Sequence, residues 1–490
     1  MKIYQLFTHT VLIGTLLLAG ACEGFLDVNE DPTAPLEVSE NLQLSALLGV
    51  FSYQVIGNDP ARTTNLWVQQ LTYSGGVPTS DNYDYKESDS NSFWNGSYTE
   101  VLNNARTLNE TAIENDSHNF AGISKVIQAW SYATLTDLFN EIPYSEAFNP
   151  VNTTPAYDTQ EFVYSEIIKL LEAALVDFAE NSPVNPGVYD LLYSGDMDKW
   201  EKLTHTLLAR YHLRLSNAPG YSATEQATKA LAALGNGFDS NDDDADFAYY
   251  DNSGEENPWY QFAIDGKWDT RTQVSGHYID LLTNLNDPRL PIQARPVGAV
   301  DNNGIVPGFT PNPAEYEGNE NGVDGGGASS WSSIGAYYSA ADASLNWASY
   351  AETKFIEAEA RFILDGAGAA QNVYNDAITA SMDKLGVDSQ ETSDYLNALP
   401  LLTDSQNPLN EIITQKYIAN FLSLENFNDW RRTGYPELEP AAEPATPTGI
   451  IPVRYPYPGS ELSNNATTVD DTGVKVGYSS LEMKVWWDAD

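Results

Sequence analysis

The chain has 490 residues, of which 42% are hydrophobic and 12% aromatic, so it can bury a sizeable core. Its 24 basic and 69 acidic residues give a formal net charge of −45. Because so acidic a protein repels polyanions, nucleic acid and anionic lipid surfaces are excluded as its main partners. The acidic residues are spread along the chain and indicate a solvated surface, which suits a neutral ligand.

The N-terminus has the pattern of an exported lipoprotein. Lys2 is followed by an apolar run from Val11 to Ala21, which ends in small residues directly before Cys22. This run is shorter than the roughly 20 residues of a transmembrane helix, so residues 1–21 are predicted to be a cleaved signal peptide. Cys22 is the only cysteine, and we expect it to carry a lipid and to form no disulfide. The alternative is a soluble secreted protein whose mature chain starts near Cys22.

Residues 22–40 are predicted to be an extended tether. Asp31-Pro32 and Ala34-Pro35 lie within it, and proline disfavours regular structure at and before its own position. The tether would lead from the lipid to the folded part of the chain, which begins near residue 41 and is long enough for one large or two ordinary domains.

Apolar residues recur at helical spacing in several segments, which predicts a mostly α fold. The segments with this spacing are 123–130, 168–178, 200–215, 355–363, 374–385 and 409–424. Short Gly- or Pro-bearing turns join neighbouring helices, and Ala351, Ala358 and Ala360 would let two helices approach closely. This pattern of amphipathic helices joined by short turns is typical of tetratricopeptide-like helix pairs, although no strict 34-residue period is present.

Long irregular segments separate these helices, and few strands beyond short hairpins are expected. The irregular segments are 74–93, 239–275, 296–333 and 435–490. Because structureless loops of this length are unusual inside compact domains and are often functional, we expect the ligand-binding residues to lie in them.

No motif for catalysis or for a cofactor is present. The chain lacks the nucleophile elbow of serine hydrolases and the glycine-rich phosphate and dinucleotide loops. His205 and His212 are too far apart on one predicted helix to form an i, i+4 metal pair. The acidic segment 239–247 lacks the Gly and terminal Glu of an EF-hand loop, so no metal site is predicted, while a structural calcium ion stays open. A pair of hydrolytic carboxylates among the 69 acids also stays open.

Aromatic residues carry the strongest signal for ligand binding. Sugar rings stack on aromatic rings, and their hydroxyls need polar partners such as Asp, Asn and Arg. Three loop clusters combine these types, and for each ring core packing is the alternative role. The candidate ligand-binding residues are Trp67, Asp81, Asn82, Tyr83 and Tyr85, then Trp259, Trp268 and Arg271, then Trp331 and Tyr337. Trp130, Trp200 and Trp430 lie in helical patterns and are assigned to the core.

Several segments resemble the SusD/RagB family of nutrient-binding outer-membrane lipoproteins of Bacteroidetes. The segments that carry the resemblance are CEGFLDVNEDPTAP after the signal, FWNGSYTEVLNNARTL at 93–108, LNDPRLPI at 285–292, ASYAETKFIEAEARF at 348–362, ITQKYIANFLSLENFNDWRRTGYPEL at 413–438, IPVRYPYPGSELSNN at 451–465 and KVWWD at 484–488. They span essentially the whole mature chain. The motifs Asp287-Pro288-Arg289 and Trp430-Arg431-Arg432 are expected to fix loops and ion pairs, not to bind ligand.

This resemblance implies a single SusD-like domain over residues 41–490, with tetratricopeptide-like helix pairs supporting a loop-rich ligand face. It implies a lipid-anchored protein at the cell surface, in the outer membrane, that works as a lid on a SusC-like TonB-dependent transporter. The expected function is capture of a neutral oligosaccharide or polysaccharide, without catalysis and without a cofactor. The alternatives are a peptide-binding lid of the same transporter type, a glycoside hydrolase and an adhesin.

Overall fold

The computed structural model describes residues 38–76, 79–266, 269–310 and 315–488. The predicted signal peptide, Cys22, nearly all of the tether and the candidate Trp268 lie outside the described residues. Within them no helix is long and apolar enough to cross a membrane.

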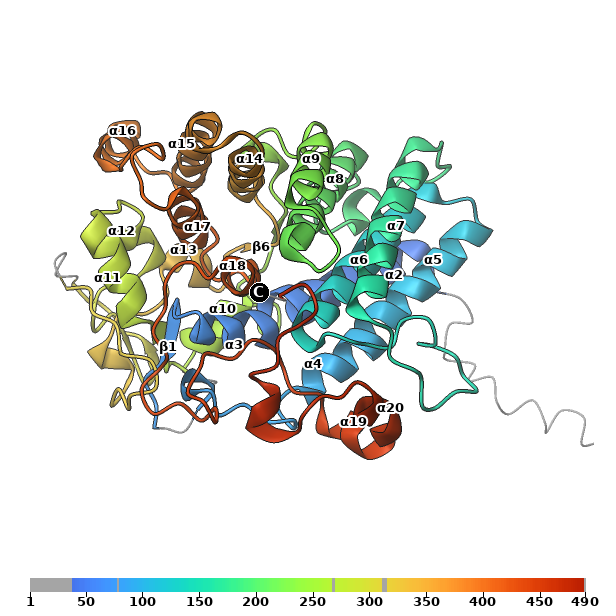
Figure 1. The fold of residues 1–490 in the computed structure, drawn as a ribbon, viewed down its shortest axis with the longest axis horizontal. Coiled ribbons are helices and arrows are strands. Elements are labelled where there is room, and N and C mark those ends of the chain that lie inside the picture. The colour runs from blue at the N-terminus through green and yellow to red at the C-terminus, as the bar shows by residue number, and fades with distance from the viewer. Residues whose placement is uncertain (1–37, 77–78, 267–268, 311–314, 489–490) are drawn as a thin grey trace, which may run out of the picture.

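Paired antiparallel helices form the scaffold, as the sequence predicted. The pairs are α6 (His118–Phe139) with α7 (Gln160–Ala179), α8 (Met197–Arg214) with α9 (Ala223–Leu234), and α14 (Tyr350–Asp365) with α15 (Ala367–Lys384). Further contacts join α5 to α6, α7 to α8 and α9 to α14, so the pairs form one continuous arc from α5 to α16 in Figure 1.

Local sequence sets where these helices start. Thr159, Asp196, Ser222 and Ser349 each precede a scaffold helix and accept a hydrogen bond from the backbone N–H three residues later. Such N-caps satisfy a backbone donor that has no partner within the helix, and each stabilises its helix by about 1 kcal/mol.

Small residues let α14 pack between two other helices, which confirms the role expected for its alanines. Ala358 is fully buried in a cluster with Ala370 and Tyr374 of α15. Ala360 is fully buried in a separate cluster with Ala227 of α9. A larger side chain at either position would have to displace a neighbouring helix.

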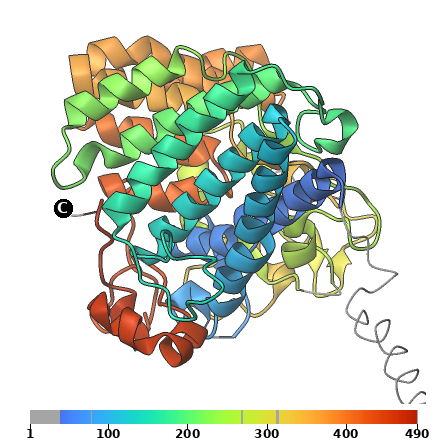
Figure 2. The same cartoon turned by 90° about the vertical axis from the view of Figure 1, so that its right-hand side faces the viewer.

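Most remaining helices are short and lie below the arc in Figure 1. Helices α5 (Asn103–Glu114) and α16 (Ser389–Ala398) are the two ends of the arc itself. The remaining helices are α2 (Glu40–Phe51), α3 (Asp59–Trp67), α4 (Asn91–Gly96), α10 (Pro258–Ala263), α11 (Gly276–Leu285), α12 (Leu290–Gln293), α13 (Ala336–Ser339), α17 (Pro408–Ala419), α18 (Glu425–Thr433), α19 (Gly459–Asn464) and α20 (Ala466–Asp471), with π-helical turns η2 (Ser52–Gly57) and η4 (Ser97–Leu102). In the view of Figure 2 the C-terminal helices α19 and α20, in red, lie at the end of the molecule opposite α14 and α15.

The prediction of one continuous helix over 409–424 is wrong. Helix α17 ends at Ala419, because Leu422 adopts a positive φ of 70° that a helix cannot contain. A second helix, α18, starts at Glu425, so the apolar pattern runs across a turn.

The strands are short and antiparallel, as expected. The pairs are β1 (Leu71–Tyr73) with β3 (Thr272–Val274), β2 (Asp246–Phe247) with β6 (Leu345–Asn346), and β4 (Val300–Asp301) with β5 (Gly304–Ile305). They hold long loops together, so segments that are distant in sequence meet on the loop side of the molecule.

The two Arg-containing motifs form buried ion pairs, as expected. Arg289 and Asp287 are fully buried and lie 2.6 Å apart between guanidinium and carboxylate. Arg432 pairs with Glu359 of α14 and, at 3.0 Å, with Asp429. Since an uncompensated buried charge is costly, the Arg289–Asp287 pair fixes the turn between α11 and α12, and the Arg432–Glu359 pair fixes α18 against α14.

Candidate functional site

An open groove lies where four loop segments meet, and it is called the loop groove below. Its volume is about 520 Å³, and it is lined by Ser74, Gly75, Gly76, Gly266, Asp269, Thr270, Arg271, Asn302, Asp324, Gly326 and Gly327. These residues follow β1, precede β3, form the β4–β5 turn and precede α13. Two predicted clusters converge here, since Arg271 lines the groove and Trp331 lies beside it.

The β1–β3 pairing builds the centre of the loop groove. Tyr73 is opposite Thr272 in the register, and the Ser74 N–H donates to the Arg271 carbonyl at 2.8 Å. The Arg271 guanidinium therefore lies over the Tyr73 ring, 5.0 Å from its centroid. Its Nε donates to Asp269 at 2.8 Å, and the Tyr73 hydroxyl donates to the same carboxylate at 2.9 Å.

Charge and burial tune these three groups. Burial and the adjacent Asp269 carboxylate raise the pKa of Tyr73 to about 12. Burial acts to raise the pKa of Asp269, but the hydrogen bonds from Arg271 and Tyr73 outweigh it, and the pKa lies below its usual value. The Arg271 side chain is 48% exposed, so a guanidinium held in one orientation faces the groove.

Trp331 is half-buried at the edge of the loop groove. Its Nε1 donates to the Gly325 carbonyl at 2.8 Å, which fixes the ring against the glycine loop. Gly326 and Gly327 have φ values of 73° and 142°, a backbone conformation that favours glycine. The ring and the loop thus hold each other at the groove.

Asp81 and Asn82 lie beneath the groove, not in it. Asp81 is fully buried and accepts four hydrogen bonds, among them 2.6 Å from Asn321 Nδ2 and 3.0 Å from the Gly322 N–H. Burial raises its pKa to about 6, against the effect of these bonds. Asn82 accepts from the Thr79 N–H and donates to the Glu443 carbonyl, both at 3.0 Å. In place of the expected ligand contacts, both side chains anchor the loops.

Trp67, Tyr83 and Tyr85 present no free ring face, which corrects the expectation that they stack on a ligand. Each is at most 2% exposed. Trp67 packs edge-on against Tyr85 and donates to the Ser80 carbonyl at 3.1 Å. Tyr83 accepts from the Ala441 N–H, and Tyr85 donates to Asp59. These rings belong to the core, as Trp130 and Trp200 do.

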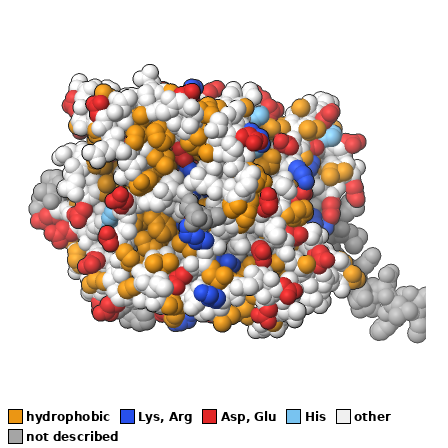
Figure 3. Space-filling view, viewed as in Figure 1, with side chains coloured by type: hydrophobic (Ala, Val, Ile, Leu, Met, Phe, Trp, Pro, Cys, Tyr) orange, Lys and Arg blue, Asp and Glu red, His pale blue; other side chains and the backbone are white. Residues whose placement is uncertain are grey.

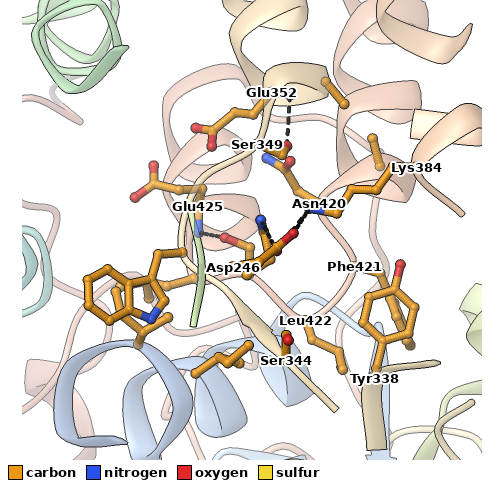
Figure 4. Close-up of a pocket in the computed structure, with 18 of the residues that line it drawn as sticks. Asp246, Tyr338, Ser344, Ser349, Glu352, Lys384, Asn420, Phe421, Leu422 and Glu425 are labelled. Carbon is orange, nitrogen blue, oxygen red and sulfur yellow. Dashed lines mark hydrogen bonds and ion pairs between the residues drawn. The ribbon is translucent and has the colours of Figure 1, made fainter. Parts of the chain in front are cut away.

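Trp259 and Tyr337 border a separate central cavity of about 250 Å³. Figure 4 shows this cavity, with Glu352, Lys384 and Asp246 among its labelled residues. Trp259 is buried in its wall on α10, and Tyr337 is exposed on α13. The charged groups in the cavity are paired with one another. Arg210 donates twice to Glu352, at 2.8 and 2.7 Å, and Lys384 pairs with Asp246 at 3.0 Å. The second predicted cluster is therefore divided, with Arg271 at the loop groove and Trp259 at this cavity.

The acidic segment 239–247 makes ion pairs with lysines. Lys202 pairs with Asp243 at 2.9 Å, and Lys384 pairs with Asp244 and Asp246. Among the described residues no group of three or more His, Cys, Asp or Glu side chains is arranged to hold a metal ion. Figure 3 shows further acidic side chains scattered over one face of the molecule with few basic ones among them.

The sequence did not single out Asn302 and Asp324, which line the loop groove. Their loop was recognised as rich in Gly and Asn, but no local pattern shows which polar side chains of a loop meet in space. The groove as a whole offers Arg, Asn and Asp side chains beside the rings of Tyr73 and Trp331, which is the mixture that a sugar requires.

The scaffold and the loop groove together define a helical-repeat protein with an open groove built from loops. A profile of the SusD-like family, described as starch-binding and associating with the outer membrane, matches residues 36–458. The chain belongs to this SusD-like family, as its motifs indicated.

Solved structures show the same fold. A chitin-binding protein is similar with a TM-score of 0.75 and 27% identity, over 92% of this chain and 100% of that one. A SusD/RagB family protein from Bacteroides thetaiotaomicron has a TM-score of 0.78 and 24% identity, over 92% and 99%. A chitin-binding SusD homologue from Flavobacterium johnsoniae has a TM-score of 0.75 and 23% identity, over 91% and 99%. A search of curated proteins gives no match.

Proposed function

We propose that this protein captures a neutral glycan at the cell surface and delivers it to a SusC-like TonB-dependent transporter in the outer membrane. The loop groove is the proposed capture site. A lipid on Cys22 would hold the protein beside its transporter, so that a modest affinity suffices at the resulting high effective concentration.

The observation that carries this proposal is the arrangement of Arg271, Tyr73 and Asp269 beside Trp331. The guanidinium is held in one orientation by its carboxylate partner and by the Tyr73 ring, so little side-chain entropy is lost on binding. It retains N–H groups for sugar hydroxyls, while Asn302 and Asp324 add an amide and a carboxylate across the groove. Half-buried Trp331 supplies aromatic surface next to these groups.

Charge favours a neutral glycan over an acidic one. The loop groove contains two carboxylates, Asp269 and Asp324, and one cation, Arg271, which is already paired. A uronic-acid or sulfated chain would meet this excess of negative charge and the −45 net charge of the protein.

Binding without turnover agrees with the lowered pKa of the groove carboxylate Asp269. A glycosidase needs one carboxylic acid with a raised pKa beside a second carboxylate. The pKa of Asp269 is instead lowered by its hydrogen bonds from Arg271 and Tyr73. Asp81 has a raised pKa, but it is buried beneath the groove. We therefore assign the groove to binding without catalysis.

Other observations support the proposed transporter partner and the proposed location in the outer membrane. The family is described as associating with the outer membrane, and the chitin-binding relatives are glycan binders by name. The apolar N-terminal run that ends at Cys22 supports the lipid anchor.

A binding screen with an activity control tests the proposal. The mature protein is titrated calorimetrically with neutral chito- and malto-oligosaccharides, with an acidic uronic-acid oligosaccharide and with a mixed peptide library, and sugar release is followed in parallel. We expect saturable binding of at least one neutral glycan and no release. Binding of peptides alone would favour the peptide-binding lid, and sugar release would favour the hydrolase.

A further inference from the structure

A second open pocket, called the aromatic pocket, lies far in sequence from the loop groove. Its volume is about 360 Å³, and its lining residues come from α4, η4, the start of α5, the α6–α7 connection and α19. Helices α4 and α19 lie in the lower part of Figure 1. It shares no lining residue with the loop groove. Several of its residues belong to the segment 93–108, which the function proposed above does not use.

Three aromatic rings line this pocket in succession. The centroid of Trp94 lies 5.2 Å from that of Tyr98, which lies 6.2 Å from that of Phe148. Trp94 forms the buried base, and Tyr98 and Phe148 are partly exposed. The Tyr98 hydroxyl donates to the Pro143 carbonyl at 2.8 Å, which fixes its ring. The result is a preorganised aromatic surface of which only parts of the Tyr98 and Phe148 rings are exposed.

The backbone around these rings is unusual at two points. Residues 91–114 run as one helical stretch through α4, η4 and α5, and its middle part, Ser97–Leu102, is π-helical. Such π-helical turns are rare and frequently occur at functional sites. Phe148 has a φ of 62°, a left-handed conformation that costs a bulky residue on the order of 1–3 kcal/mol. The Arg106 guanidinium lies 5.5 Å from the Phe148 ring centroid and holds the ring in place.

Polar side chains with spare hydrogen-bonding capacity surround the rings. Asn95 and Thr99 are exposed on the helical side. Asn103 accepts from Arg106 through Oδ1 at 3.0 Å, which leaves its Nδ2 donor available. Glu461 accepts from the Tyr157 hydroxyl through Oε2 at 2.8 Å, which leaves Oε1 as an acceptor. No lining residue is basic, and the neighbouring Arg106 is already paired with Glu110 at 2.6 Å, which favours a neutral ligand over an anionic one.

We propose that the aromatic pocket is a second glycan-binding site, which takes a neutral sugar unit on Tyr98 and Phe148 and binds its hydroxyls through Asn95, Asn103 and Glu461. The proposal rests on the glycan-binding function inferred above and extends it to a second site. A pocket of this size, near the lower end of the roughly 300–1,000 Å³ typical of ligand sites, limits the occupant to one or two sugar rings.

The test separates the two sites by substitution. Arg271→Ala with Trp331→Ala disables the loop groove, and Phe148→Gly is then added in that background. Glycine suits the left-handed conformation, so in Phe148→Gly the relief of backbone strain offsets part of the packing lost with the ring, and thermal unfolding checks that the variant is folded. Thr99→Arg, which fills the exposed rim, is the second blocking variant, and Tyr250→Ala removes a ring that is 58% exposed elsewhere as the matched control.

Calorimetric titration with chitohexaose and maltohexaose gives the result. We expect the groove-disabled protein to keep weak binding of one of these glycans, and Phe148→Gly or Thr99→Arg to weaken that binding by roughly three- to tenfold while Tyr250→Ala does not. Loss of all binding in the groove-disabled protein would overturn the second site and leave the first intact. Residual binding that both pocket variants leave unchanged would also overturn it. A wild-type protein that binds neither glycan would overturn both proposals.

Discussion

Replacement of Arg271 by alanine should weaken ligand binding strongly while it changes the stability of the protein little. The guanidinium pairs with Asp269 at 2.8 Å and lies 5.0 Å from the Tyr73 ring centroid, but its side chain is 48% exposed. Exposed ion pairs contribute only about 0–1 kcal/mol, so Arg271→Ala should change the free energy of unfolding by no more than about 1 kcal/mol. In the complex, the same guanidinium would donate charge-assisted hydrogen bonds to sugar hydroxyls.

A hydrogen bond to a charged group contributes about 1.5–3 kcal/mol, which corresponds to a roughly 10- to 150-fold loss of affinity on removal. Isothermal titration calorimetry of wild type and Arg271→Ala with the best glycan from the screen measures this ratio, and thermal unfolding measures stability. Arg361→Ala is the matched control, because Arg361 is 41% exposed and pairs with Glu357 at 2.7 Å on the scaffold helix α14. Equal affinity of Arg271→Ala and wild type, or an equal loss in Arg361→Ala, would refute the assignment.

Three further outcomes are expected. Asp81 and Asp244 should make the free energy of unfolding larger at about pH 5 than at about pH 7.5, because burial raises the pKa of each to about 6 from about 4 in the unfolded chain, so their contribution is lost as the pH rises through 6. Burial lowers the pKa of His205, His212 and His277, which acts in the opposite direction, so urea unfolding of the wild type is compared with that of Asp81→Asn at both pH values. The excess stability of the wild type over this variant should be larger at pH 5, and a larger excess at pH 7.5 would contradict the prediction. Glu359→Ala should lower the free energy of unfolding by about 3 kcal/mol, because it leaves the buried Arg432 without its main partner; an unchanged urea midpoint would show that the pair is dispensable. Cys22→Ala should move the protein, once its signal is removed, from the membrane fraction to the soluble fraction; a signal-free variant that stays in the membrane fraction would show that the lipid anchor is not what holds it.

The sequence predicted the scaffold well because helical periodicity reports burial directly. The apolar residues spaced from Ile123 to Trp130 and from Trp200 to Leu215 are buried in the core of the protein, on the inner faces of α6 and α8 and at the end of α8. The helix prediction was wrong after residue 419, where the apolar residues keep helical spacing although the chain forms a turn. Leu422 continues the apolar pattern after α17, but its positive φ ends the helix there.

The binding residues were harder to predict because an aromatic residue in a loop has the same sequence signature whether it binds ligand or fills the core. Trp67 and Tyr83 stand beside polar residues, yet both are fully buried. Arg271 and Tyr73 meet only because β1 pairs with β3, and a three-residue strand carries too little pattern to reveal its partner. The ligand-binding role of Arg271, Trp331 and Tyr337 stays a prediction.

A crystal structure of the protein soaked with the glycan that binds in the screen tests the central claim most directly. The account predicts sugar density in the loop groove, with a hydroxyl within hydrogen-bond distance of the Arg271 guanidinium and a sugar ring beside Trp331. Sugar density confined to another place, such as the central cavity between Trp259 and Tyr337, with the loop groove empty, would contradict it.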